Sequence, residues 1–332
     1  LNIEVDFQNK IISGTANYDI QVAQGENRIV FDTRNLDIKR ILVDSVETKN
    51  WWLGPEKPFM GVALEIEVTD SSNLVSIEYA TTDGAEALQW LSPQQTAGKE
   101  QPFLFTQSQA ILARTWLPCQ DSPGIRYTYE ATVKVPSNLL ALMSATNPTK
   151  LDSTGIYHFE MKQPIPSYLM ALAVGDLQYQ SVGSETGVYA EPSVLESAAY
   201  EFADMQKMLE AAESLYGKYA WEQYDVIVLP PSFPFGGMEN PRLTFATPTI
   251  LAGDRSLTAL VAHELAHSWS GNLVTNSTWN DFWLNEGFTV YFERRIMEAV
   301  YGKDYANMLA ILGWQDLQQT LEEFEATPND TK

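Results

Sequence analysis

The pentapeptide His-Glu-Leu-Ala-His at residues 263–267 determines how the rest of the chain is interpreted. On a helix, residues i and i+4 lie on one face, so the imidazoles of His263 and His267 can bind a single metal ion. Glu264 then faces a water molecule on that metal, where its carboxylate can act as a general base. A catalytic zinc site keeps three protein ligands and one open position. The pattern is typical of a zinc hydrolase and requires a third ligand elsewhere in the chain.

The third ligand is predicted from a second motif, Trp-Leu-Asn-Glu-Gly at 283–287. Its glutamate, Glu286, follows His267 by nineteen residues and lies near the start of a predicted helix over about 282–301. A loop between the two helices can bring Glu286 back to the metal. We therefore expect one Zn²⁺ per chain, held by two imidazoles and one carboxylate.

Glu293 is a candidate to support the metal site from the same predicted helix. It lies two turns after Glu286 on the same face, and carboxylates commonly orient metal-bound imidazoles. An exposed helix glutamate that pairs with Arg294 or Arg295 is an equally good interpretation. The third histidine of the chain, His158, lies alone in a predicted strand and is expected to be an ordinary polar residue without a metal.

The second half of the chain mixes helical and extended patterns. Apolar residues recur every three or four positions in its helical stretches, and Gly217 is placed to end the first of them. The predicted elements are a helix over about 193–216, strands over 226–229 and 243–246, and helices over about 256–270, over about 282–301 and from Tyr305. The second half is therefore expected to be α+β.

The first half has a different period. Apolar and polar residues alternate there, as in the stretch 64–68, and turn dipeptides such as Asp83-Gly84 separate the alternating runs. A period of two indicates half-buried strands. We therefore expect an all-β domain of antiparallel sheets, saddle-like or sandwich-like, over residues 1–175, and an α+β domain over residues 176–332.

Composition disfavours several classes of protein. The 332 residues are 45% hydrophobic, which is enough to build folded cores, and they carry 43 acidic and 21 basic residues for a net charge of −22. Without a basic cluster, nucleic-acid binding is not expected. No apolar run is long enough for a membrane span, and a single cysteine, Cys119, excludes an intrachain disulfide. A cytoplasmic location is expected, while export with a removed leader stays open because the chain starts at Leu1.

Further stretches extend these motifs over most of the chain. They are Ala-Leu-Gln-Trp-Leu-Ser-Pro (87–93), Leu-Phe-Thr-Gln-Ser-Gln-Ala (104–110), Leu-Pro-Cys-Gln-Asp (117–121), Pro-Ser-Tyr-Leu (166–169), Pro-Phe-Gly-Gly-Met-Glu-Asn (234–240) and His-Glu-Leu-Ala-His-Ser-Trp-Ser-Gly-Asn (263–272). Together with 283–287 they closely resemble the zinc aminopeptidases of the leukotriene A4 hydrolase type. The resemblance runs from about residue 87 to residue 287 and is far more specific than two histidines four residues apart.

The resemblance implies a thermolysin-like catalytic domain and a set of substrate-binding residues. Glu239 matches the family residue that binds the free α-ammonium of a peptide, and Gln109 matches the glutamine that helps at the same end. The backbone of Gly236 and Gly237, followed by Met238, matches the segment that lies along the substrate. A buried carboxylate opposite an ammonium is also the physical minimum for such selectivity. The implied activity is removal of N-terminal residues from short peptides.

The chain departs from the family in one respect. The family also uses a downstream tyrosine hydroxyl to stabilise the oxyanion, and basic residues of a C-terminal helical domain to hold the far end of the substrate. Tyr291, Tyr301 and Tyr305 do not match that tyrosine. The chain is therefore expected to be a fragment, with a catalytic domain that is incomplete at its C-terminus and without the C-terminal helical domain.

Two other functions stay open. The family name suggests hydrolysis of a lipid epoxide, and a catalytically silent metal-binding protein is the other alternative. Glu264 argues against a silent protein, because such a protein has no use for a base beside the metal. Side-chain specificity and oligomeric state are not predicted, since Phe235, Met238 and Trp279 can line a pocket or belong to the core.

Overall fold

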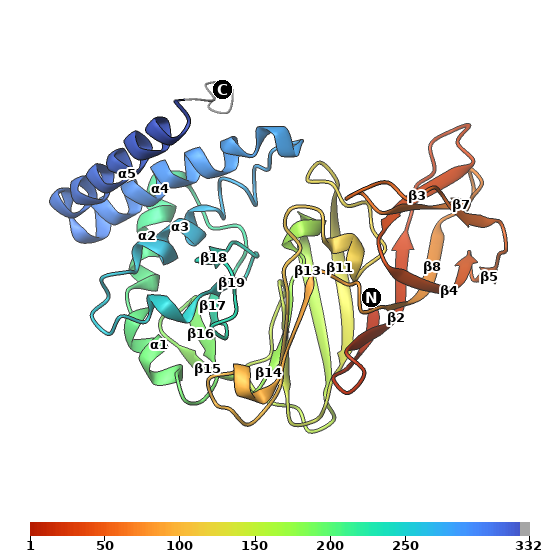
Figure 1. Cartoon of the computed structure of the whole chain (residues 1–332), viewed down its shortest axis with the longest axis horizontal. Helices are drawn as coiled ribbons and strands as arrows, with labels where there is room; N and C mark the ends of the chain where they lie inside the picture. Colours follow the sequence, from red (N-terminus) through yellow and green to blue (C-terminus); the bar gives the residue numbers. More distant parts are fainter. Residues whose placement is uncertain (326–332) are drawn as a thin grey trace.

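The computed structural model describes residues 1–325, in two halves that differ in secondary structure (Figure 1). All strands that end at or before Gly175 pair among themselves, and the strands from Gln178 onward form a separate sheet. Figure 1 shows the helices gathered beside that separate sheet, at the green-to-blue end of the chain. We propose that the boundary between the two domains lies in this connection, at about residue 175.

The β-rich half contains three sheets. The largest has seven strands in the order β13-β11-β1-β2-β8-β4-β5, and its neighbours are antiparallel except for β1 and β11, which run parallel. Its strands are β1 (Asn2–Asp6), β2 (Ile11–Asp19), β4 (Leu36–Val43), β5 (Val46–Glu47), β8 (Leu74–Thr81), β11 (Arg126–Lys134) and β13 (Ile156–Pro166). The two smaller sheets are β3 (Arg28–Thr33), β7 (Val62–Glu67) and β6 (Trp51–Leu53), and β12 (Leu140–Met143), β14 (Leu172–Gly175), β10 (Phe103–Thr106) and β9 (Leu88–Leu91). The expected all-β fold is confirmed, with one parallel pair that alternation alone does not reveal.

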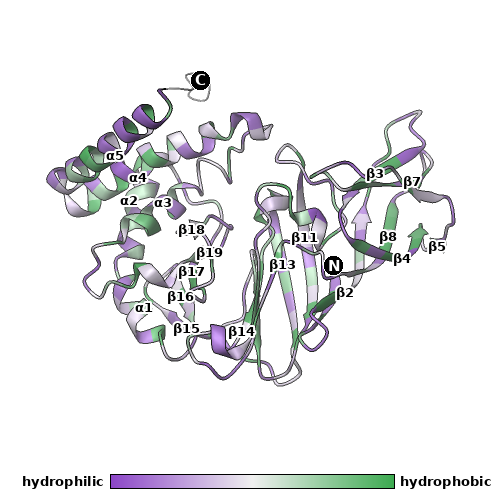
Figure 2. Ribbon diagram, in the orientation of Figure 1, coloured by the Kyte–Doolittle hydropathy of each residue, from purple (hydrophilic) through white to green (hydrophobic). Residues whose placement is uncertain are grey.

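The alternation of apolar and polar residues explains how these strands build a core. In β11, Tyr129, Ala131 and Val133 are buried, while Glu130 between them is exposed. Figure 2 shows the same mixture of hydrophobic and hydrophilic residues along the strands of the β-rich half. Each strand therefore presents one apolar face to the interior and one polar face outward.

The second half is a five-stranded sheet with helices packed beside it. Its strand order is β15-β16-β17-β19-β18, with β16, β17 and β19 parallel and the two edge strands antiparallel. The strands are β15 (Gln178–Ser181), β16 (Thr186–Ala190), β17 (Tyr224–Val228), β19 (Leu243–Ala246) and β18 (Gly237–Met238), and the helices are α1 (Leu195–Glu201), α2 (Met205–Tyr216), α3 (Ala259–Ala266), α4 (Trp283–Tyr301) and α5 (Lys303–Glu323). The expected α+β fold is confirmed. Among the described residues, no helix combines the length and apolarity needed to cross a bilayer.

Two of the helices differ clearly from their predicted bounds, and the last helix begins at Lys303, two residues before the predicted start at Tyr305. The helix expected over 193–216 is interrupted after Glu201, and Asp204 at the break contacts Lys207 at 2.7 Å and Tyr301 at 3.2 Å. The helix expected over 256–270 is shorter, from Ala259 to Ala266, and the backbone continues in turns after it. Both changes come from tertiary contacts and loop geometry, which the apolar period does not encode.

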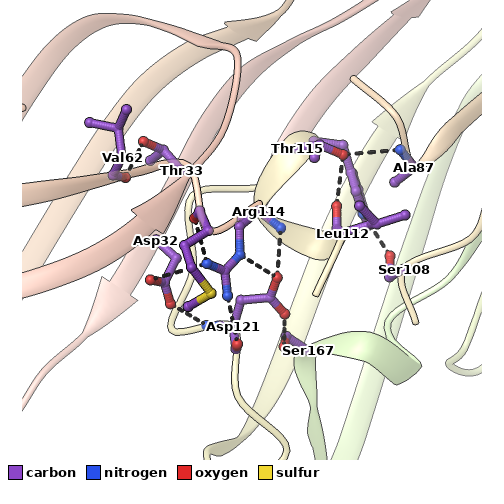
Figure 3. A network of polar contacts seen from close by, with 12 residues as sticks. Asp32, Thr33, Val62, Ala87, Ser108, Leu112, Arg114, Thr115, Asp121 and Ser167 are labelled. Carbon is purple, nitrogen blue, oxygen red and sulfur yellow. Dashed lines mark hydrogen bonds and ion pairs between the residues drawn. The ribbon is translucent and has the colours of Figure 1, made fainter. Parts of the chain in front are cut away.

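A buried network fixes the loop between β10 and β11 to the rest of the β-rich half (Figure 3). The Arg114 guanidinium donates from Nε to Oδ2 of Asp121 at 3.0 Å and from Nη1 to the main-chain oxygen of Met60 at 2.7 Å. The second carboxylate oxygen of Asp121 accepts from Ser167 at 2.6 Å, and the Asp121 main-chain N–H donates to Asp32 at 2.9 Å. Because Ser167 begins the short helix Ser167–Leu169, the network also positions the residues that face the second half.

Candidate metal and substrate site

The two sequence motifs meet where α3 packs against α4. α3 carries His263 and Glu264, and His267 follows directly after its last turn. On α4, Glu286 and Glu293 are seven residues apart and therefore lie on the same face of the helix. The structure thus brings all five of these side chains to the interface between α3 and α4.

The candidate metal ligands form a compact triangle. Nε2 of His263 lies 3.2 Å from Nε2 of His267, and Oε2 of Glu286 lies 3.5 Å and 3.7 Å from these two nitrogens. A tetrahedral zinc ion with bonds of about 2.0 to 2.1 Å separates its ligand atoms by about 3.4 Å. The donor types and their spacing therefore fit a tetrahedral zinc ion with one open position.

Partners on the other ring nitrogens hold both imidazoles in this orientation. Nδ1 of His263 lies 3.1 Å from Oε2 of Glu293, and Nδ1 of His267 lies 3.0 Å from the main-chain oxygen of Ser270 and 3.1 Å from Oγ1 of Thr289. A proton on Nδ1 serves these acceptors and leaves the lone pair of Nε2 free for a metal. Glu293 contacts His263 with one oxygen and Arg294 with the other. Because Glu293 is buried, the alternative of an exposed glutamate is wrong, although the expected pairing with Arg294 is present.

Carboxylates outnumber cations around the two imidazoles. Burial lowers the pKa of His263, but hydrogen bonds to Glu286 and Glu293 outweigh it and raise the pKa to about 10. Burial raises the pKa of Glu264 to about 8, and His263 opposes this while the charges of Glu239 and Glu286 add to it. Both shifts have the sign expected where several carboxylates converge without enough positive charge. The cluster therefore favours the binding of a cation.

Glu264 occupies a space that exists because residue 237 is glycine. The Glu264 side chain is 5% exposed, and a Cβ on Gly237 would lie 2.2 Å from its Oε1. Gly237 belongs to the edge strand β18, which pairs with β19. The glycine motif thus places its backbone directly against the candidate general base.

Glu239 lies beside the candidate metal ligands, and one of its carboxylate oxygens has no hydrogen-bond partner among the described residues. Donor atoms of Glu239, Glu264 and His267 all lie within 4.8 Å of one another. Glu239 is 4% exposed, and its Oε1 has no hydrogen-bond partner among residues 1–325. A buried, unpaired carboxylate oxygen is costly, so its natural complement is a cation that arrives with a ligand. These three donors overlap the zinc triangle at His267, and the triangle is the better metal site because its atoms have tetrahedral spacing.

The other residues expected at the substrate lie around β18. Gln109 is half-buried and follows Gln107, whose Nε2 donates to Sδ of Met238 at 3.3 Å. Gly236 precedes β18, where a Cβ would meet only the end of Leu260, at 3.1 Å. The structure therefore brings Gln107 to the glycine motif, whereas no hydrogen bond among the described residues connects Gln109 to it.

Tyr168 is a neighbour of the site for which the sequence analysis gave no role. Its hydroxyl accepts from Nδ2 of Asn285 at 3.4 Å, and its ring packs edge-on against Trp279 at 5.0 Å. Burial raises the pKa of Tyr168 well above its usual value, and the charges of Glu239 and Glu286 add to this effect. Its position in the motif Pro-Ser-Tyr-Leu is the only signal in the sequence that could have found it.

The three tyrosines that do not match the family motif make other contacts. Tyr301 donates to Asp204 at 3.2 Å, Tyr305 donates to the main-chain oxygen of Ser256 at 3.2 Å, and Tyr291 is 59% exposed. Of the remaining residues considered in the sequence, Phe235 is 47% exposed, and Trp279 is partly buried against Tyr168. His158 contacts Thr132 on the neighbouring strand at 3.1 Å, as an ordinary polar residue does.

Cavity size alone does not locate this site. In the described part of the chain, a cavity of about 1490 Å³ lies in the β-rich half, between residues of β2, β11 and β13, and none of the clustered histidines or glutamates lines it. The chemistry of the donor atoms therefore identifies the site, not the volume of the space.

Comparison with known proteins finds matches to both halves of the chain. Residues 1–169 match the domain described as Peptidase M1 N-terminal domain, and residues 200–330 match the Peptidase family M1 domain. A leukotriene A-4 hydrolase of Xenopus laevis is 46% identical over 338 residues, with 98% of this chain and 55% of the relative covered. A leucine aminopeptidase 2 of Yarrowia lipolytica is 43% identical over 330 residues, with 98% of this chain and 50% of the relative covered.

Solved structures give the same result. The structure of yeast LTA4 hydrolase in complex with bestatin superposes with a TM-score of 0.91 at 40% identity, over 97% of this chain and 51% of that one. The chain thus spans about half the length of the relatives it matches. The resemblance expected from the motifs is confirmed, and two matched domains together cover most of the sequence. The chain belongs to peptidase family M1.

Proposed function

We propose that the protein containing this chain is a zinc aminopeptidase that hydrolyses the N-terminal peptide bond of short peptides. One observation carries the proposal: the triangle of His263, His267 and Glu286 lies beside Glu264 and beside the unpaired carboxylate oxygen of Glu239. A metal-ligand set, a general base and an ammonium acceptor therefore lie within one small volume. The family match and the relatives named leucine aminopeptidase 2 support this assignment.

Each side chain has a distinct task in the proposed reaction. A zinc ion held by the triangle would polarise the scissile carbonyl and lower the pKa of a coordinated water towards about 7. Glu264 accepts a proton from the attacking water and delivers it to the leaving amine. Glu293 and Thr289 keep the two imidazoles oriented through their Nδ1 atoms.

Substrate binding is proposed to use the residues around β18. The free oxygen of Glu239 accepts the α-ammonium of the peptide, assisted by Gln109. The backbone of Gly236, Gly237 and Met238 lines the path of the substrate chain. An acylated N-terminus carries no charge, so it cannot pair with the buried carboxylate of Glu239, and such a substrate is disfavoured.

Two further proposals concern the rest of the protein. The greater length of the relatives supports an oxyanion-stabilising tyrosine and a C-terminal helical domain outside this chain. The single, buried and unpaired Cys119 is compatible with a cytoplasmic location.

The decisive experiment compares leucyl anilide with its N-acetylated form in the zinc-loaded whole protein. We expect hydrolysis of the free-amine substrate alone, and loss of that activity in Glu264→Gln with zinc still bound. Glu196→Gln, a change in the first turn of α1, serves as the matched control and should stay active. Equal cleavage of both substrates, or an active Glu264→Gln variant, would contradict the assignment.

The name of the Xenopus relative supports one second candidate, hydrolysis of a lipid epoxide such as leukotriene A-4. A lipid-epoxide assay on the same preparation separates the two functions. Turnover of the epoxide without cleavage of the anilide would favour the second candidate.

A further inference from the structure

The loop that follows α3 connects the two parts of the proposed site. Nδ1 of His267 lies 3.0 Å from the main-chain oxygen of Ser270, and Nδ2 of Asn272 donates to the main-chain oxygen of Glu239 at 2.7 Å. Asn272 is 1% exposed, so water does not readily replace this hydrogen bond. A displacement of Asn272 therefore moves the backbone that carries the Glu239 carboxylate.

Arg126, from the β-rich half, holds this loop in place. Its Nη2 donates to the main-chain oxygen of Asn272 at 2.7 Å, and its Nη1 donates to Oγ1 of Thr275 at 2.6 Å. On its own side, Nε and Nη2 donate to the main-chain oxygen of Pro164, at 3.1 Å and 2.6 Å. Pro164 lies in β13, which pairs with β11, the strand that begins at Arg126. One guanidinium thus joins a pair of strands to the loop beside the site.

The guanidinium does not act as half of an ion pair. Within residues 1–325, no carboxylate lies within 4.0 Å of Arg126. Its donors go to carbonyl and hydroxyl oxygens, and a planar fork with fixed donor directions suits that use better than a flexible ammonium does. The partial burial that lowers the pKa of Arg126 is the cost of placing the charge here. These hydrogen bonds fix the position of the 271–275 loop.

We propose that Arg126 is a positioning residue for the amino terminus of the substrate, acting through Asn272 on Glu239. The inference rests on the proposed function, because it needs Glu239 to bind an ammonium. Arg126 itself does not touch the substrate. Its loss lets the 271–275 loop relax, so that the Glu239 backbone loses the hydrogen bond that fixes the carboxylate.

The test uses the whole zinc-loaded protein and two ligands that differ only in the amine. Leucyl anilide is the substrate, and 4-methylpentanoyl anilide, which lacks the amine, is the competitor. We expect Arg126→Met to raise KM for leucyl anilide about tenfold and to change kcat by less than about threefold. The affinity for the competitor and the zinc content should stay unchanged. Arg126→Lys should recover part of the loss, because an ammonium can still donate to the Asn272 carbonyl.

Arg28→Met is the matched control, since Arg28 lies in the same half and forms an exposed ion pair with Glu65. It should leave KM and the preference for the free amine unchanged. An Arg126→Met variant that keeps its full preference for the amine, or that weakens both ligands equally, overturns the inference. If the parent protein itself shows no preference for the amine, the proposed function fails first and the inference fails with it.

Discussion

A methyl group added at position 237 should displace the carboxylate of Glu264, the proposed general base, and leave the zinc ligands in place. An added Cβ on Gly237 would lie 2.2 Å from Oε1, 2.5 Å from Cδ and 2.7 Å from Cγ of Glu264, whereas ordinary contacts begin at 3.4 Å. The carboxylate must therefore move by roughly 1 Å in Gly237→Ala. Misplacing a catalytic group by about 1 Å can cost about 100-fold in rate, which corresponds to about 2.7 kcal/mol in the activation free energy.

A glycine away from the site supplies the control. In Gly313→Ala, on α5, the new Cβ would lie 3.4 Å from Nη2 of Arg294, which is an ordinary contact with the end of a flexible side chain. Neither Gly237 nor Gly313 has the positive φ that would strain an alanine, so only the variant at position 237 forces a clash. Overpacking at position 237 should also lower the free energy of unfolding, by about 1 to 3 kcal/mol.

The assay is kcat/KM for leucyl anilide in both variants, together with zinc content and thermal unfolding. We expect Gly237→Ala to lose about 100-fold in kcat/KM with zinc still bound, and Gly313→Ala to lose less than about threefold. If Gly237→Ala is as active as Gly313→Ala, then Glu264 is not held in a fixed position by β18, and the assignment of the general base is wrong.

Three more variants test the surroundings of the site and the fold. Glu293→Gln should weaken zinc binding by about 10-fold to 100-fold in a chelator competition, because an imidazole loses its charged partner, whereas Glu298→Gln on the same helix should have no effect. Arg114→Met should lower the free energy of unfolding by about 3 to 5 kcal/mol in a denaturant titration, because Asp121 is left buried without its cation; a loss below about 1 kcal/mol would show that the network in Figure 3 is not a stabilising one. Burial raises the pKa of Asp225 from 3.8 to about 6, so ionisation of this carboxyl lowers the free energy of unfolding as the pH rises from about 4 to 6. Asp225→Asn cannot ionise, so the change in the free energy of unfolding between pH 4 and pH 7 should become more favourable by up to about 3 kcal/mol. An unchanged pH dependence would contradict this.

The periods of the sequence predicted the two halves of the fold, because each period reflects a local property of helix or strand. They did not predict the parallel pairing of β1 with β11, since strands that alternate in the same way can pair in either direction. They also missed the break after Glu201. Asp204 is drawn there towards Tyr301, which lies 97 residues further along the chain, and no local pattern encodes such a partner.

The candidate site divides in the same way. His263, Glu264 and His267 could be found from spacing alone, because one helix sets their geometry. Arg126 gave no signal, because its importance comes from a hydrogen bond to Asn272 that spans 146 residues. Residues that act on a substrate carry recognisable chemistry, whereas residues that position others are defined only by their contacts.

The distance from Glu239 to Glu264 and His267 decides which bond the proposed enzyme can cut. In a peptide, the carbonyl carbon of the first residue lies only about 2.5 Å from the α-amino nitrogen, since the N–Cα and Cα–C bonds are about 1.46 and 1.52 Å long. Each further carbonyl lies up to about 3.8 Å more distant. The donor atoms of Glu239 lie within 4.8 Å of those of Glu264 and His267, so an ammonium held by Glu239 would bring its first carbonyl closer to the general base than any later one. The proposed removal of one residue at a time therefore rests on this spacing together with the negative charge of the Glu239 carboxylate.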